Sequence, residues 1–153
     1  MTMTENELQD GRVVAIAGPV IDVEFPRGAL PELNSAIEFT IELEGESTIV
    51  LAEVAQQLGN SRVRAICMKP TDGLVRGTAV RNTGHGIQVP VGDGVLGNVW
   101  NVWGEALDTQ PEGLDEMERW DIHRPAPTFD SLEPSARMFE TGIKVVDLLT
   151  PYV

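Results

Sequence analysis

Within the segment of residues 36–43, apolar and polar side chains alternate at every position from Ile37 onward, and this pattern constrains the fold more than any other feature of the chain. The apolar side chains would lie on one face of the segment and the polar ones on the other: Ile37, Phe39, Ile41 and Leu43 against Glu38, Thr40 and Glu42. A period of two is that of a β-strand with one buried face. The segment therefore predicts a strand in a sheet that covers a core.

Short segments of the same kind, separated by turns that contain Gly, Pro and Asn, extend from Gly11 to about Val80. Six strands are expected, over residues 12–17, 20–25, 36–43, 48–55, 62–68 and 74–80. Such a set must cover the edges of its sheet, and closing into a small antiparallel barrel does so. A sandwich of two sheets is the alternative. The side chains expected to point inward are Ile21, Val23, Phe25, Ile37, Phe39 and Ile41.

The character of the sequence changes near residues 81–84. Residues 1–10 are expected to form an acidic flexible tail, and residues 11–81 the barrel. Residues 82–153 are first rich in glycine and proline, and apolar residues then recur at helical spacing between Val95 and Trp103. A helix is expected there, with Gly104 as its stop. Residues 135–149 show a second amphipathic pattern, which Pro151 ends.

The chain is acidic, with 24 Asp and Glu residues against 11 Lys and Arg residues and a net charge of −13. Direct binding to nucleic acid or to an anionic membrane surface depends on clustered Lys and Arg, so the composition argues against both and favours basic or mixed protein partners. The single cysteine, Cys67, excludes an intrachain disulfide and fits a reducing compartment. Residues 1–10 do not have the composition of a signal or transit peptide.

One glycine motif has the pattern that is typical of dinucleotide-binding sites. Gly92, Gly94 and Gly97 form GDGVLG, a GxGxxG pattern. A dinucleotide site needs a buried parallel strand before this motif, a helix after it, and a second strand that ends in an acid about 20 residues further on. Pro90 favours an edge strand before the motif, and an acidic, turn-rich stretch follows the expected helix. We therefore reject a dinucleotide site.

Two further pairs of residues have structural interpretations. Asp22 and Glu24 share the polar face of an expected strand, so we interpret them as part of a solvated face rather than as an acid–base pair. Trp100 and Trp103 are expected to pack in a core or an interface rather than to stack on a base.

No residue is expected to carry catalysis or to bind a cofactor or a metal. His85 and His123 have no further ligand at metal-binding spacing, and Cys67 is expected to be a buried thiol. The only lysines are Lys69 and Lys144, and neither follows a glycine, so the phosphate loop GxxxxGK[ST] does not occur in this sequence. The chain alone is expected not to bind ATP or ADP.

Five segments, in order along the chain, resemble the β subunit of the rotary, F-type ATP synthase. Two are similar to its N-terminal barrel: GRVVAIAGPVIDVEFPRGALPEL (residues 11–33) and LAEVAQQLGNSRVRAICMKPTDGLVRGTAV (residues 51–80). Three are similar to the segments that lead into its nucleotide-binding domain: VPVGDGVLGNVWNVWGEALD (residues 89–108), IHRPAPTF (residues 122–129) and ETGIKVVDLLTPY (residues 140–152).

The resemblance implies a mostly β fold, with a six-stranded antiparallel barrel over residues 11–81 and the incomplete start of an α/β P-loop nucleotide-binding domain over residues 82–153. It implies a catalytic subunit that binds Mg-ATP or Mg-ADP and makes ATP from ADP and phosphate with a transmembrane proton gradient. Three such subunits would alternate with three α subunits around a central stalk, and the barrels would hold this hexamer together. The complex would lie at the cytoplasmic face of a bacterial cell membrane, or the equivalent face of an energy-coupling membrane, and the chain would reach the membrane only through the complex.

In the family, the phosphate loop follows the position that Val153 occupies here, so this chain alone is expected to be inactive. A free-standing assembly barrel without catalysis is the alternative. The α subunit, vacuolar-type subunits and export-apparatus ATPases share the barrel plan and are further relatives to consider. An in-frame continuation into a glycine-rich GKT loop would support a part of the catalytic subunit, whereas a stop codon would support the free-standing barrel.

Overall fold

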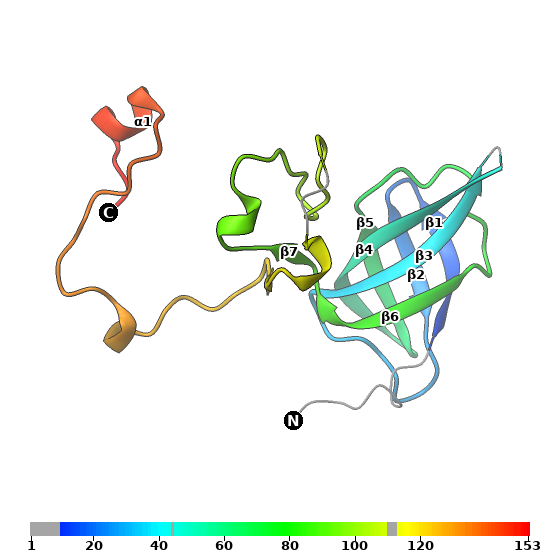
Figure 1. Cartoon of the computed structure of the whole chain (residues 1–153). Helices are drawn as coiled ribbons and strands as arrows, with labels where there is room; N and C mark the ends of the chain where they lie inside the picture. Colours follow the sequence, from blue (N-terminus) through cyan, green and yellow to red (C-terminus); the bar gives the residue numbers. More distant parts are fainter. Residues whose placement is uncertain (1–9, 44, 110–112) are drawn as a thin grey trace. The chain divides into compact units, whose positions relative to one another are not determined.

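Six strands form a closed barrel in the first half of the chain (Figure 1). The computed structural model describes residues 10–43, 45–109 and 113–153, so the acidic tail predicted over residues 1–10 lies outside the described residues except for Asp10. The strands are β1 (Gly11–Ala17), β2 (Val20–Glu24), β3 (Ser35–Leu43), β4 (Glu46–Gly59), β5 (Arg62–Cys67) and β6 (Ala79–Gly86). Their order around the barrel is β1-β2-β5-β4-β3-β6. The predicted six-stranded antiparallel barrel is confirmed, and the sandwich is wrong.

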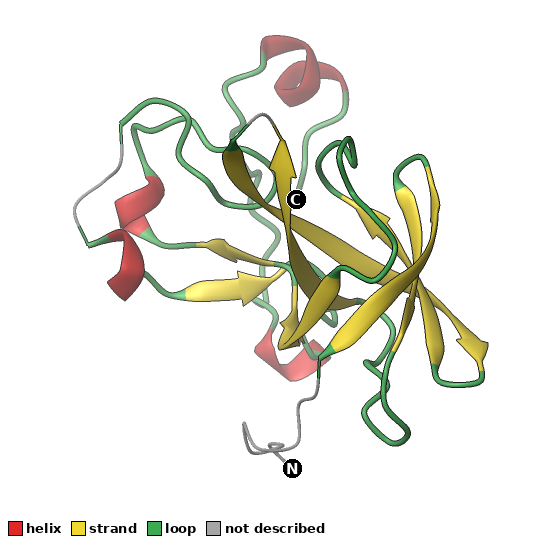
Figure 2. Cartoon of the chain, turned by 90° about the vertical axis from the view of Figure 1, so that its right-hand side faces the viewer, coloured by secondary structure: helices red, strands yellow, loops and turns green. Residues whose placement is uncertain are grey.

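The first and last strands close the barrel. Gly11 pairs with Val80 and Arg12 with Ala79, so β1 and β6 leave no open edge between them. Every strand therefore has two hydrogen-bonded neighbours, which satisfies backbone groups that an open sheet would expose. Extra residues in β1, β4 and β6 shift the register and mark β-bulges, which let short strands bend around a small barrel (Figure 2).

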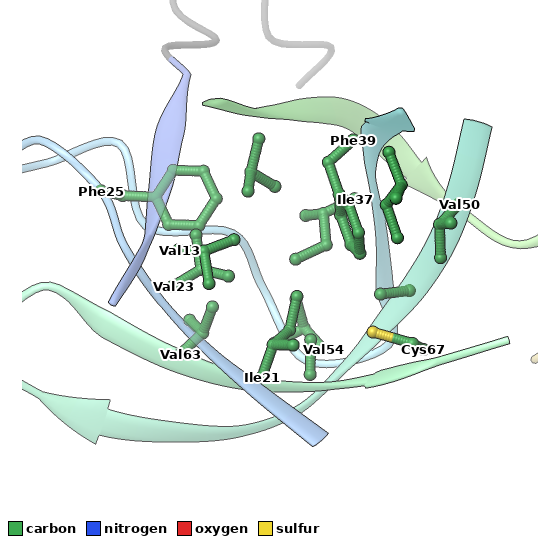
Figure 3. Packing of buried hydrophobic residues seen from close by; sticks show 14 residues of the cluster. Val13, Ile21, Val23, Phe25, Ile37, Phe39, Val50, Val54, Val63 and Cys67 are labelled. Atoms are coloured by element: carbon green, nitrogen blue, oxygen red, sulfur yellow. The ribbon is translucent and has the colours of Figure 1, made fainter. Parts of the chain in front are cut away.

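Alternation along the strands fills the interior with aliphatic side chains. Figure 3 shows them converging from the surrounding strands. The six side chains predicted to point inward are all at most 5% exposed. The other apolar members of this core are Val13, Val50, Ala52, Val54, Val63, Ala65, Cys67 and Val80.

Gly11 is required where β1 meets the core. A Cβ atom at this position would lie 2.9 Å from the Phe25 ring and 2.9 Å from the Glu24 carbonyl oxygen. The absent side chain lets the Phe25 ring, which is 3% exposed, close this end of the core.

The sixth strand lies further along the chain than the sequence pattern predicted. β6 begins at Ala79, whereas the expected strand began at Leu74. Residues before Ala79 form turns, in which Leu74 donates to the Thr71 carbonyl and Thr78 to the Val75 carbonyl, and Gly77 has a φ of 90°. The polar residues of β6 conceal its strand character in the sequence. The domain boundary expected between residues 81 and 82 falls inside β6. The division into two domains at this point stays a prediction.

A two-stranded antiparallel sheet follows the barrel. β7 (Gln88–Pro90) pairs with β8 (Arg119–Asp121), and the sequence analysis did not predict β8. Its three residues are too few to show a period, and all are exposed. The 3-10 helices η2 (Asp93–Val95) and η3 (Leu114–Glu116) lie between these strands in the sequence.

The helix predicted between Val95 and Trp103 is wrong. Only one 3-10 turn forms, and an isolated bridge joins Trp100 to Ala106. The Asn101 side-chain oxygen accepts hydrogen bonds from the backbone N–H groups of Trp103 (3.2 Å) and Glu105 (2.9 Å). Such local side-chain bonds favour a turn over a helix, and glycines around the segment weaken a helix further.

Residues 124–153 form a second unit, with the 3-10 helix η4 (Phe129–Ser131) and the helix α1 (Lys144–Leu149). Of the predicted amphipathic stretch over residues 135–149, only the last six residues are helical. Gly142, with a φ of 78°, breaks the pattern just before the helix. Leu148 and Leu149 are 80% and 74% exposed. Among the described residues, no helix is long and apolar enough to cross a membrane.

The core should tolerate truncation poorly, and two isoleucines on neighbouring strands offer a matched test. We expect Ile37→Ala to lower the free energy of unfolding by about 2–5 kcal/mol, because Ile37 is fully buried and the change leaves a cavity. Ile49 is 60% exposed, so Ile49→Ala should cost about 0.5 kcal/mol or less. Urea unfolding followed by far-UV circular dichroism measures both, and equal losses would contradict this description of the core.

Amide hydrogen exchange should separate the two halves of the chain. We expect strong protection in β4 and β5, because their ladder bonds open only when the barrel unfolds. The amides of α1 should exchange at nearly the rate of an unfolded peptide, because the helix is short and its apolar side chains are largely exposed. Equal protection of β5 and α1 in a monomeric sample would contradict the prediction.

Candidate functional site

The outer face of the barrel carries ion pairs that link neighbouring strands. Arg12 of β1 binds Glu24 of β2 with its Nη2 atom 2.7 Å from Oε2, and Arg62 of β5 approaches the other oxygen of the same carboxylate at 3.4 Å. One carboxylate thus bridges three adjacent strands. The pairing follows from register, since both Arg12 and Arg62 lie directly opposite Glu24.

A second pair lies beside the first. Arg64 of β5 holds both carboxylate oxygens of Asp22 in β2, with Nε–Oδ1 and Nη2–Oδ2 distances of 2.8 and 3.0 Å. The hydrogen bonds from Arg64 lower the pKa of Asp22, and those from Arg12 lower the pKa of Glu24. Because the pKa values of Asp22 and Glu24 are lowered in the folded state, their ion pairs stabilise the barrel at neutral pH. This stabilisation is lost as the pH falls through the lowered pKa values and the carboxylates become protonated.

These contacts decide between the two interpretations of Asp22 and Glu24. Both carboxylates lie on the polar outer face, as predicted, and arginines cover much of each one. An acid–base pair needs pKa values pushed apart, with one carboxyl kept protonated near neutral pH. Both pKa values are instead lowered by arginine, so the two groups stay ionised and their geometry is that of structural ion pairs.

The GDGVLG motif lies in a different setting from that of a dinucleotide site. β7, which precedes the motif, is antiparallel to β8, and residues 93–95 form a 3-10 turn instead of the start of an α-helix. Gly92 and Gly97 have φ values of 94° and 82°, so they serve as turn residues here. The arrangement lacks the parallel strand and the helix N-terminus that hold a pyrophosphate.

The two tryptophans near this motif are half-buried and bonded within their own loop. The Trp100 indole donates to the Val95 carbonyl at 2.9 Å, and the Trp103 indole donates to Oε2 of Glu105 at 2.9 Å. The other oxygen of Glu105 accepts a hydrogen bond of 3.0 Å from Nζ of Lys69, which lowers the pKa of Glu105. Lys69 therefore ties the loop to the end of β5.

The remaining residues singled out in the sequence lie apart from one another. His85 is exposed and its Nδ1 atom is 2.7 Å from the Gly86 carbonyl oxygen. Cys67 is buried in the barrel, as predicted, and burial raises the pKa of its thiol to about 11. Lys144 is exposed at the first position of α1. Within the described ranges, no three His, Cys, Asp or Glu side chains are placed to share a metal ion.

Two long-range contacts escaped the sequence analysis. Nε2 of His123 lies 2.9 Å from Oε2 of Glu53, and Lys69 binds Glu105. The partners are 70 and 36 residues apart in the sequence, so no local spacing signals either pair. Each pair joins the barrel or the loop after β5 to a residue that follows β6 in the sequence, so the contact depends on how the segments after the barrel fold back.

The barrel also agrees with a known domain family. Residues 13–84 match the family model described as ATP synthase alpha/beta family, beta-barrel domain. The match begins within β1 and ends within β6, so it covers all six strands. The closed topology and the buried core of the barrel agree with this match, so this part of the chain is similar to the beta-barrel domain of the ATP synthase alpha/beta family.

Proposed function

We propose that this chain is the N-terminal part of the β subunit of an F-type ATP synthase. In this proposal the barrel holds the catalytic subunit in a hexamer with α subunits, at the cytoplasmic face of a bacterial membrane or its equivalent. The parent protein joins ADP and phosphate to ATP as the proton gradient turns the central stalk. The observation that carries the proposal is the family match over the strands of a closed barrel.

The construction of the barrel suits an assembly role. Its strands satisfy one another's backbone groups, so contacts with neighbouring subunits would be made by side chains on the outer face. Ion pairs such as those of Glu24 and Asp22 hold that face in a fixed arrangement. A rigid surface of this kind loses little conformational entropy on association.

The segments after the barrel support the choice of the β subunit. Residues 122–129 and 140–152 resemble the corresponding segments of that subunit. In the second, Thr141 donates to Oδ1 of Asp147 from both its N–H and its hydroxyl group, and a bridge joins Phe139 to Tyr152. These contacts connect the residues before α1 to Asp147 within the helix and to Tyr152 after it. The exposed apolar side chains of α1 fit a role in packing against the nucleotide-binding domain of the parent.

No position of this chain matches a residue with which the family binds Mg-ATP or positions water. We therefore assign assembly to the described barrel and assign the chemistry to the nucleotide-binding domain of the parent. Mg-ATP and Mg-ADP are in this proposal the ligands of the parent protein. Direct binding of nucleotide to this chain would need a lysine in a glycine-rich loop, which the sequence does not contain.

Association with the α subunit tests the proposal. The chain should form a complex with purified α subunit of the same synthase in sedimentation velocity runs, whereas the chain alone should stay monomeric because copies with a net charge of −13 repel one another. Excess chain should also lower the yield of active hexamer assembled from α and full-length β. The proposal would be overturned if the chain neither bound α at tens of micromolar nor competed with full-length β.

A further inference from the structure

A small apolar pocket opens at the end of the barrel where β3 turns into β4. Its volume is about 230 Å³. Residues of the β3–β4 hairpin form one wall, and the loop after β5 forms the other; the lining residues are Ile41, Leu43, Thr48, Val50, Lys69, Pro70 and Asp72. None of these lining residues takes part in the ion pairs of Glu24 and Asp22. A role for the pocket in binding does not rest on the proposed function.

The hairpin forms this wall because its inward face continues past the core. Ile41 lies opposite Thr48 across the two strands, and Leu43 lies opposite Glu46. Ile41 is 5% exposed but Leu43 is 51% exposed, so the apolar face leaves the core between these two residues. A side chain that covered Leu43 would bury apolar surface that now contacts water.

The second wall is held close to the hairpin by a glycine. Gly73 has a φ of 84°, and a Cβ atom there would lie 3.2 Å from Cγ2 of Ile41 and 3.3 Å from Cδ1 of Leu43. The loop thus rests directly against the hairpin. The pocket is a defined depression between two packed segments.

One acidic and one basic residue line the pocket, and a second carboxylate lies beyond it. Asp72 lines it, and Glu46 lies on the same face of β4 as Thr48 and Val50, beyond the pocket. Lys69 is the one basic residue among the lining residues, and its ammonium group is already bonded to Glu105 at 3.0 Å. In the described part of the chain, neither Asp72 nor Glu46 forms an ion pair, so their charges remain available to a cationic partner.

We propose that this pocket binds one aliphatic side chain of a basic protein partner, with Lys or Arg residues beside that side chain facing Asp72 and Glu46. The volume is below the roughly 300–1,000 Å³ of ordinary small-molecule pockets, which favours a single side chain as the occupant. Carboxylates at the rim of an apolar depression complement basic residues that flank an aliphatic anchor.

A second copy of this chain fits the pocket poorly. The chain carries a net charge of −13, so two copies repel. Of its 11 Lys and Arg residues, six already form ion pairs within the described part of the chain: Arg12, Arg62, Arg64, Lys69, Arg81 and Arg137. The partner is therefore a different, basic protein.

Peptide titration of the full 153-residue chain tests the proposal. The probe is acetyl-Gly-Lys-Leu-Lys-Gly-amide, added to ¹⁵N-labelled chain at low salt. We expect amide shifts confined to residues 41–43, 46–50 and 69–73. Peptides with Ser in place of Leu, or with Glu in place of both Lys residues, should bind at least threefold more weakly. Equal affinity for all three peptides, no saturable shift up to 10 mM, or shifts centred elsewhere would overturn the proposal.

Variants on opposite faces of the hairpin separate a pocket from a general attraction to an acidic surface. Asp72→Asn and Glu46→Gln should each raise the dissociation constant of the probe about two- to fivefold. Glu42→Gln removes the same charge from the outward face of β3 and should leave the constant unchanged. Likewise, Leu43→Asn should weaken binding and Ile49→Asn, on the outward face of β4, should not. Equal effects within either pair would mean that the pocket is not the binding site.

Discussion

The pairing of β1 with β6 is the constraint on which the rest of the structure depends. Gly11 and Arg12 bond to Val80 and Ala79, and these pairs join the two ends of a sheet that would otherwise be open. Once the sheet is closed, one face of every strand points inward, and the aliphatic side chains there have nowhere to lie but a shared interior. The outer face is then left to polar groups, whose partners are set by strand register. The arginine–carboxylate contacts of Glu24 and Asp22 follow from the register of β1, β2 and β5.

Closure also places the surfaces for which we propose functions. The continuous outer face is available to neighbouring subunits, and the two ends of the barrel are left for loops. At one end the Phe25 ring covers the core beside Gly11. At the other end the hairpin of β3 and β4 runs past the core, and the loop around Gly73 packs against it to leave a small apolar pocket. The family match concerns the barrel scaffold as a whole. The pocket depends on the particular residues at the end where β3 and β4 meet.

Much of the barrel could be predicted from the sequence because its signal is local. Ile37 and Phe39 alternate with polar neighbours, and burial at alternate positions is a property of one strand by itself. β6 was placed too early because its own residues are mostly polar and take their strand conformation from β1 and β3. The helix expected after Val95 failed for the opposite reason: the apolar spacing was present, but Asn101 bonds to the backbone of a turn.

The surface contacts were less predictable, because they join residues that are distant in the sequence. Asp22 and Glu24 could be assigned to an outer face from alternation, but their arginine partners depend on the order of β1, β2 and β5. The bond between Lys69 and Glu105 depends on a loop whose conformation the sequence pattern misrepresented. The side chains of the pocket at Leu43 come from two segments that only the folded barrel brings together.

Interstrand nuclear Overhauser effects between β1 and β6 test the closure most directly. In a ¹⁵N- and ¹³C-labelled sample, the backbone protons of Gly11 and Arg12 should show strong cross-peaks to those of Val80 and Ala79, in the pattern of antiparallel neighbours. Cross-peaks between β1 and β2, for example from Val13 to Val23, provide the internal reference. If the β1–β2 cross-peaks appear and the β1–β6 cross-peaks do not, the sheet is open in solution, and neither the shared core nor the two barrel ends can have the arrangement that closure requires.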